Sequence, residues 1–85
     1  MWYVYVLRCC DASLYIGMTN DVQRRLREHN RSLVAWTKSR LPVSLMYQDA
    51  FSARSEARKR EKYLKSGWGK QWLKRKFGDP SGGAG

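Results

Sequence analysis

The chain has 85 residues, the size of one small domain, and a formal net charge of +10 from 17 Lys and Arg residues against seven acids. No run of about 18 apolar residues is present, which excludes a membrane-spanning helix. The charge points to a polyanionic partner, and a highly charged solvated surface is the alternative.

The positive charge is concentrated late in the chain. Residues 54–76 contain ten basic residues and two acids, Glu56 and Glu61, with Trp68 and Trp72 interleaved. This composition suits phosphate contacts combined with base stacking. We therefore expect a nucleic-acid partner, DNA first and RNA as the alternative, bound by a monomer.

The cysteines and the first residues indicate the compartment. Cys9 and Cys10 are adjacent, and vicinal cysteines bridge only with strain, so reduced thiols are expected. The chain start lacks the basic segment and apolar core of a signal peptide. Both features predict a cytoplasmic protein.

Two strands are predicted first in chain order. Residues 2–8 are aromatic, β-branched and almost continuously apolar, as in a strand that is covered on both faces. After a short polar break, residues 14–17 return to the strand pattern. The break is short, so the two segments predict an antiparallel β-hairpin.

A helix is predicted next, ending near Asn30. Asn20 is the expected N-cap, and Gln23 stands three residues later as in a capping box. The spacing i, i+3, i+4, i+7 puts four residues on one helical face: Val22, Arg25, Leu26 and His29.

The rest of the chain predicts a loop, a strand and two helices. Residues 31–40 have no clean period and are expected to form a loop. A strand is expected over residues 43–48 and a helix over residues 52–65, which ends before Gly67. A short further helix follows over residues 68–77 and is expected to pack Trp68 and Trp72.

The order β-β-α-β-α-α predicts an α/β (α+β) fold with a three-stranded antiparallel sheet flanked by helices. One domain is expected over residues 1–78. Residues 79–85 are rich in Gly and offer nothing to pack, so a disordered C-terminal tail is expected there.

Several polar side chains fall on faces that should be buried. Tyr3 and Tyr5 share one face of the first strand, and Tyr15 and Gly17 share one face of the second. The tyrosines have a structural interpretation, because Tyr is common in strands. Arg25 borders the apolar stripe of the helix, where it either clamps a phosphate or extends to water.

Glu61 and His29 also have two interpretations each. Glu61 borders the buried stripe of a helix that is crowded with basic residues, so it forms a salt bridge or holds a divalent cation. One carboxylate suffices for Mg²⁺, which fills its other positions with waters and substrate phosphates. His29 lies one turn after Arg25 and is either structural or catalytic.

Four segments in order resemble the GIY-YIG nuclease family. Residues 3–5 stand in the place of the first motif, and residues 15–17 match the second motif letter for letter. Residues 20–26 resemble the helix that follows, with its characteristic arginine at Arg25. Residues 57–61 resemble the later helix, with its metal-binding glutamate at Glu61. The likeness covers residues 2–75 and extends to the short members of the family.

The resemblance implies one-step hydrolysis of a nucleic-acid strand with one Mg²⁺ or Mn²⁺ ion. It implies that Tyr5 takes the proton of the attacking water and that Tyr15 orients the water or the phosphate. It assigns charge stabilisation to Arg25 and metal binding to Glu61. His29 joins the candidate catalytic residues, and Tyr3 and Gly17 are motif positions. A non-catalytic nucleic-acid-binding module is the alternative function, and an accessory protein of a ribonucleoprotein is a third.

Two expectations about placement follow. First, basic residues outside the catalytic set are expected to contact the nucleic acid: Arg24, Arg27, Lys38, Arg40, Arg58, Lys62, Lys65 and Lys70. Second, Tyr5, Tyr15, Arg25 and Glu61 are expected to line one concave, open surface of the sheet. A Glu61 on the opposite side of the sheet is expected only for a binding module.

Overall fold

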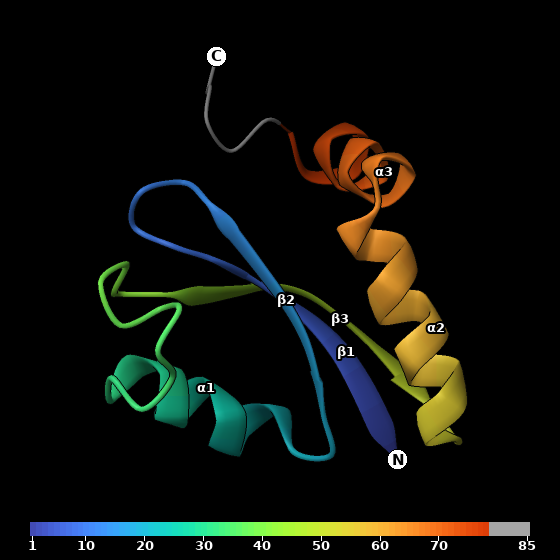
Figure 1. The fold of residues 1–85 in the computed structure, drawn as a ribbon, viewed down its shortest axis with the longest axis horizontal. Coiled ribbons are helices and arrows are strands. Elements are labelled where there is room, and N and C mark those ends of the chain that lie inside the picture. The colour runs from blue at the N-terminus through green and yellow to red at the C-terminus, as the bar shows by residue number, and fades with distance from the viewer. Residues whose placement is uncertain (79–85) are drawn as a thin grey trace.

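The computed structural model describes residues 1–78 and contains three strands and three helices (Figure 1). Their order confirms the predicted α+β fold, and the elements are β1 (Trp2–Arg8), β2 (Leu14–Thr19), α1 (Val22–Asn30), β3 (Ser44–Phe51), α2 (Arg54–Lys65) and α3 (Gly67–Phe77). The expected tail, residues 79–85, lies outside the described residues. Within residues 1–78, no helix combines the length and apolarity that crossing a bilayer requires.

The sheet is antiparallel throughout, in the order β2-β1-β3, so β1 is central and β2 is an edge strand. In this register Tyr5 stands between Gly17 on one side and Gln48 on the other. The pairing with β3 shifts between Val6 and Leu7, which marks a bulge. Alternation along β1 then assigns its side chains to two different layers.

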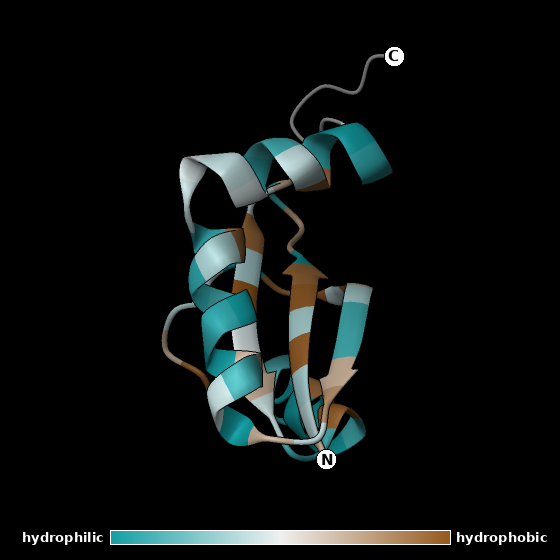
Figure 2. Cartoon of the chain, turned by 90° about the vertical axis from the view of Figure 1, so that its right-hand side faces the viewer, coloured by the Kyte–Doolittle hydropathy of each residue, from teal (hydrophilic) through white to brown (hydrophobic). Residues whose placement is uncertain are grey.

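One layer lies under α2 and α3. Val4 and Val6 of β1 pack there with Ile16 of β2 and with Ala57 and Leu64 of α2. Figure 2 shows α2 over one part of the sheet and α3 across its upper end, with mostly hydrophilic residues on the outer side of α2. This layer is the larger part of the core, and α3 closes it through its own buried Leu73.

The other layer lies under α1. Tyr5 and Leu7 of β1 form a second cluster there, which includes Tyr15 of β2 and Leu26 of α1. Figure 1 shows α1 and α2 on opposite sides of the sheet. The β1 residues of the two clusters alternate along the strand, so each helix covers its own face.

Some local predictions need correction. Asp21, not Asn20, caps α1, because its side chain accepts a hydrogen bond from the backbone N–H of Arg24 at 3.0 Å. Asn20 accepts instead from the guanidinium of Arg24, also at 3.0 Å. The strand β2 continues to Thr19 and β3 to Phe51, beyond the predicted ends. Both cysteines are free thiols.

Candidate active site

The Tyr5 ring occupies space that the neighbouring strand leaves free because Gly17 has no side chain. Its ring lies across Gly17, where an added Cβ would come within 2.6 Å of the Tyr5 hydroxyl oxygen and 2.8 Å of Cζ. Real Cβ atoms do not approach so closely, so any other residue would displace the ring. Tyr15 lies beside it, with 6.1 Å between the two ring centroids. The motif glycine therefore makes room for the hydroxyl of Tyr5.

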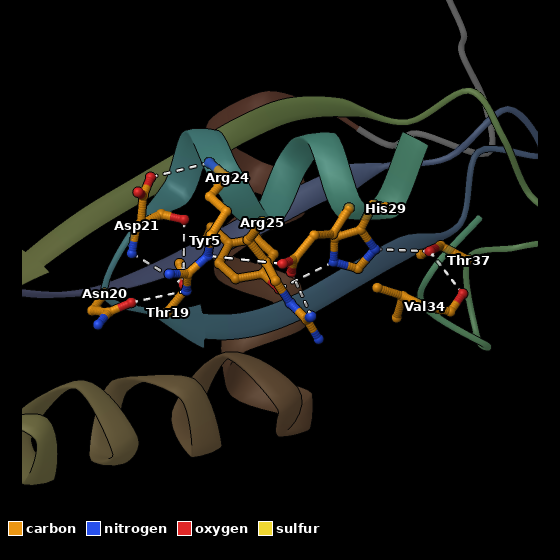
Figure 3. A network of polar contacts seen from close by, with 10 residues as sticks. Tyr5, Thr19, Asn20, Asp21, Arg24, Arg25, His29, Val34 and Thr37 are labelled. Atoms are coloured by element: carbon orange, nitrogen blue, oxygen red, sulfur yellow. Dashed lines mark hydrogen bonds and ion pairs between the residues drawn. The ribbon is translucent and has the colours of Figure 1, made fainter. Parts of the chain in front are cut away.

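The Tyr5 hydroxyl reaches His29, which α1 presents to the sheet. The hydroxyl oxygen lies 3.1 Å from Nε2 of His29, and the other ring nitrogen, Nδ1, lies 2.7 Å from Oγ1 of Thr37 (Figure 3). Thr37 in turn donates to the backbone oxygen of Val34. A threonine that donates to a carbonyl accepts from Nδ1–H. Nε2 is then the acceptor for the Tyr5 hydroxyl, an assignment that rests on this network.

Arg25 lies one turn before His29 and is half-exposed. Its Nη1 donates to the Glu28 carboxylate at 2.9 Å, and Glu28 also pairs with Arg24 at 3.8 Å. The guanidinium lies close enough to Tyr5 to act on its pKa. A guanidinium with five donors retains free positions after one ion pair, so Arg25 can bind a phosphate oxygen next to the tyrosines.

Burial changes the acidity of the central pair. Burial raises the pKa of Tyr5 to about 12, and the hydrogen bond and charge of Arg25 act against this rise. Burial lowers the pKa of His29 first, and the positive Arg25 lowers it further. His29 is therefore neutral near pH 7 and able to accept a proton, while Tyr5 keeps its proton unless another group receives it.

The expectation that all four motif residues line one open surface is wrong for two of them. Tyr5 is buried, at 2% exposure, and Glu61 lies on another face. Tyr5, Tyr15 and Arg25 belong to the α1 side, whereas Glu61 lies on α2, which packs on the opposite face through Ala57. Whether a helix takes one face or the other depends on the connections between elements, which residue spacing does not reveal. The salt bridge that was one alternative for Glu61 is present: Nζ of Lys65 lies 3.3 Å from Oε2.

Glu61 is nevertheless connected through Lys65 to the edge of the sheet that carries Tyr15. Arg60, its neighbour on the helix, lies on the β3 side. Its guanidinium carbon is 4.8 Å from the ring centroid of Trp72, which packs on Tyr47 of β3. Lys65, the partner of Glu61, lines a pocket with three residues of β2. The Glu61 side chain, 15% exposed, is thus paired with a lysine that reaches the β2 edge.

The metal-binding capacity of this region is small. Within residues 1–78, no group of three or more His, Cys, Asp and Glu side chains is placed to hold a metal ion. Glu61 is the expected metal ligand, and its carboxylate is paired with Lys65. A cation that needs one protein carboxylate fits this arrangement, and a cation that needs a full protein cage does not.

The predicted nucleic-acid contacts lie on several elements. Seven of the eight are exposed, on α1, in the 31–40 segment, on α2 and at the start of α3: Arg24, Arg27, Lys38, Arg58, Lys62, Lys65 and Lys70. Arg40 is half-buried, because it pairs with Asp11 at 3.4 Å and lies over the ring of Trp36 at 4.1 Å. These positions do not themselves test the contacts, which stay predictions.

Three further residues belong to the basic block or to a motif: Trp68, Trp72 and Tyr3. Trp68 is 74% exposed and stays available for stacking. Trp72 does not, because it packs against Tyr47 and Phe77 as part of the core. Tyr3 is half-buried and lines a separate shallow pocket near the start of α1, away from His29.

The sequence did not identify two partners of the site. Glu28 stands three residues after Arg25 on the same helix, and this spacing was enough to suggest an ion pair. Thr37 orients His29 from the 31–40 segment, which has no helical or strand period. Nothing in the sequence marks that interaction.

Comparison with known proteins identifies a family that the chain matches. The family model described as GIY-YIG catalytic domain matches residues 1–75. A UPF0213 protein of Staphylococcus haemolyticus is 47% identical over 73 residues, which are 85% of this chain and 89% of that protein. A UPF0213 protein of Desulfotalea psychrophila is 46% identical over 66 residues, 75% of this chain but only 60% of the longer relative.

A solved structure gives the same answer for the fold. The solution NMR structure of a UPF0213 protein from Bacillus halodurans is similar with a TM-score of 0.56 and 37% identity. The likeness covers 94% of this chain and 89% of that one. The predicted resemblance to short GIY-YIG proteins is thereby confirmed.

Proposed function

The chain belongs to the GIY-YIG catalytic-domain family, and we propose that it is a metal-dependent endonuclease that hydrolyses phosphodiester bonds in DNA, with RNA as the alternative substrate. The observation that carries the proposal is the hydrogen bond between the Tyr5 hydroxyl and a neutral, fully buried His29. A core needs no such pair beside an arginine and a second tyrosine. A hydrolytic site does, because a water must lose a proton next to a phosphate.

The proton route follows from the tautomer of His29. An attacking water gives its proton to the Tyr5 oxygen as the Tyr5 proton passes to Nε2 of His29. Thr37 holds the other ring nitrogen and so keeps Nε2 free to accept. A phenol with a pKa of about 12 stays protonated near pH 7, so Tyr5 accepts the proton of the water only as it passes its own proton to His29.

The phosphate is bound by the remaining groups. Arg25 binds a non-bridging oxygen through donors that Glu28 does not use, and it stabilises the charge that develops there. Tyr15, half-exposed at the β2 edge, orients the water or the phosphate. Glu61 would hold one Mg²⁺ or Mn²⁺ ion, which supplies Lewis-acid polarisation of the phosphate when bound. The exposed basic residues of α1 and α2 position the strand.

A non-catalytic nucleic-acid-binding module is the second candidate. The position of Glu61 favours it, because α2 lies on the far face of the sheet and Lys65 already pairs with the carboxylate. We prefer the nuclease because β2 is an edge strand and Lys65, the partner of Glu61, reaches that edge. A phosphate bound there can contact groups from both faces of the sheet.

Cleavage assays decide between the two candidates. Branched DNA, single strands and RNA are incubated with Mg²⁺ or Mn²⁺, with Glu61→Ala as the control. The nuclease proposal predicts metal-dependent products from at least one substrate and none from Glu61→Ala, which keeps its fold and its binding. Binding without cleavage of any substrate by the wild-type chain would leave the binding module.

A further inference from the structure

A pocket of about 430 Å³ opens at the β2 edge and has no part in the proton route. It is lined by β2, by the 31–40 segment and by α2 and α3, through the residues Leu14, Tyr15, Ile16, Trp36, Lys65 and Lys70. Its volume is in the range of small-ligand sites. One wall is apolar and aromatic, and two lysines stand on the other elements.

Trp36 gives this pocket its particular character. The indole is 42% exposed, although it has a large apolar ring. The guanidinium of Arg40 lies 4.1 Å from the ring centroid and is itself paired with Asp11 at 3.4 Å. Tyr15 meets Trp36 at 5.5 Å between centroids, tilted by 42°. The ring is therefore oriented before any ligand arrives, which lowers the entropy cost of binding.

We propose that this pocket binds one unpaired nucleotide, with its base against Trp36 and Tyr15 and its phosphate at Lys65 and Lys70. Base–aromatic stacking and lysine–phosphate pairing are the two interactions that single-strand sites combine. A base within a duplex has both faces covered by its neighbours and presents no free face to Trp36. The pocket therefore distinguishes single-stranded from paired nucleic acid.

The inference deepens the proposed function and rests on it for its place in the reaction. Tyr15 belongs both to the pocket and to the cluster around Tyr5. A nucleotide in the pocket therefore lies next to the proposed scissile phosphate. The substrate class that follows is a strand with an unpaired nucleotide adjacent to the cleaved bond, as in a single strand, a flap or a gap.

Binding without metal tests the pocket separately from cleavage. The anisotropy of a labelled oligothymidylate and of a labelled duplex is measured in EDTA for the wild type and for Trp36→Ala. The expected result is about a 10- to 100-fold loss of single-strand affinity with less than about a threefold loss for the duplex. Trp36→Phe keeps a ring and is expected to recover part of the single-strand affinity.

Two further variants make the test specific. Leu33→Ala is the matched control, because Leu33 is 69% exposed in the same segment and does not line the pocket. It is expected to change neither affinity. Leu14→Trp fills the pocket from β2 and replaces Trp36→Ala if that variant does not fold, as circular dichroism shows. It is expected to reduce single-strand binding alone.

Each result has one meaning for the pocket. Equal losses on single strand and duplex, or the same effect from Leu33→Ala as from Trp36→Ala, would overturn the inference. A chain that shows the selective loss but never cleaves any substrate would contradict the nuclease and leave the pocket standing. A chain that cleaves a substrate but shows no selective loss would overturn the pocket inference and leave the nuclease proposal standing.

Discussion

The hydroxyl oxygen of Tyr5 lies 3.1 Å from Nε2 of His29, and both side chains are buried, at 2% and 0% exposure. The two residues are 24 positions apart, on a central strand and on a helix. Thr37 fixes the tautomer from a third segment. This pairing makes the candidate site sensitive to pH, to space at Gly17 and to the charge of Arg25, and each dependence can be measured.

Stability is predicted to fall on mild acidification because of His29. Its pKa is lowered in the fold, chiefly by burial and then by Arg25, so below about pH 6.5 the unfolded chain binds the proton more readily. The contribution of neutral His29 is thus present above that pH and is lost as the pH falls through the lowered value. Urea unfolding at a series of pH values measures it.

His29→Gln is the control for this dependence, because Gln keeps hydrogen-bonding groups and does not titrate. Its unfolding free energy should vary less with pH in this window. Glu28 and Asp11, whose pKa values are lowered by their partners Arg25 and Ser13, act only at lower pH. A wild-type slope that persists in His29→Gln would show that another group titrates.

Gly17→Ala is predicted to displace Tyr5. The new Cβ would lie 2.6 Å from the hydroxyl, so the ring must move and its hydrogen bond to His29 breaks. Overpacking of this kind costs about 1–3 kcal/mol of unfolding free energy. Gly67→Ala is the matched control, because nothing lies within 4 Å of a Cβ there. Urea unfolding compares them, and equal stability of the two variants would contradict the packing argument.

Arg25→Ala is predicted to reduce the cleavage rate at saturating substrate by about 10²- to 10³-fold, the usual loss when a donor to the developing charge is removed. Arg24→Ala, its exposed neighbour, should weaken binding and leave the saturating rate nearly unchanged. Single-turnover kinetics over a range of protein concentrations separates rate from affinity. If both variants lose only affinity, Arg25 is a binding residue.

Nucleic-acid binding is predicted to be mainly electrostatic. Arg58 is exposed on α2 and is expected to bind a phosphate. Removing one basic side chain that neutralises a duplex phosphate reduces the slope of log affinity against log salt by about 0.9, so Arg58→Ala should flatten the slope by that amount. Titrations at several salt concentrations provide the slope. An affinity that does not change with salt would argue against the basic surface.

The sequence predicted the α1 side of the site and not the α2 side. Alternation along β1 and β2 placed Tyr5 and Tyr15 together, and helical spacing placed Arg25 and His29 over them. Both patterns are local. The face of the sheet that α2 covers depends on the path of the whole chain, so the position of Glu61 relative to Tyr5 could not be predicted from spacing.

Smaller errors have local causes. Asn20 and Asp21 both suit a cap, and the carboxylate of Asp21 reaches the Arg24 backbone while the amide of Asn20 engages the Arg24 side chain. Thr37 could not be assigned to His29 because an irregular segment has no period. Trp68 and Trp72 were both predicted to pack, and Trp72 does so, whereas Trp68 is 74% exposed.

The central claim is that Tyr15 and Glu61 serve one metal-dependent site around the β2 edge. It is tested most directly by adding Mn²⁺ to the isotope-labelled chain with a cleavage-resistant oligonucleotide, while paramagnetic broadening of the amide signals is recorded. The account predicts broadening at both Glu61 and the β2 residues near Tyr15, abolished in Glu61→Gln with binding retained. Broadening that is absent, or that spreads over the basic helices and persists in Glu61→Gln, would contradict it.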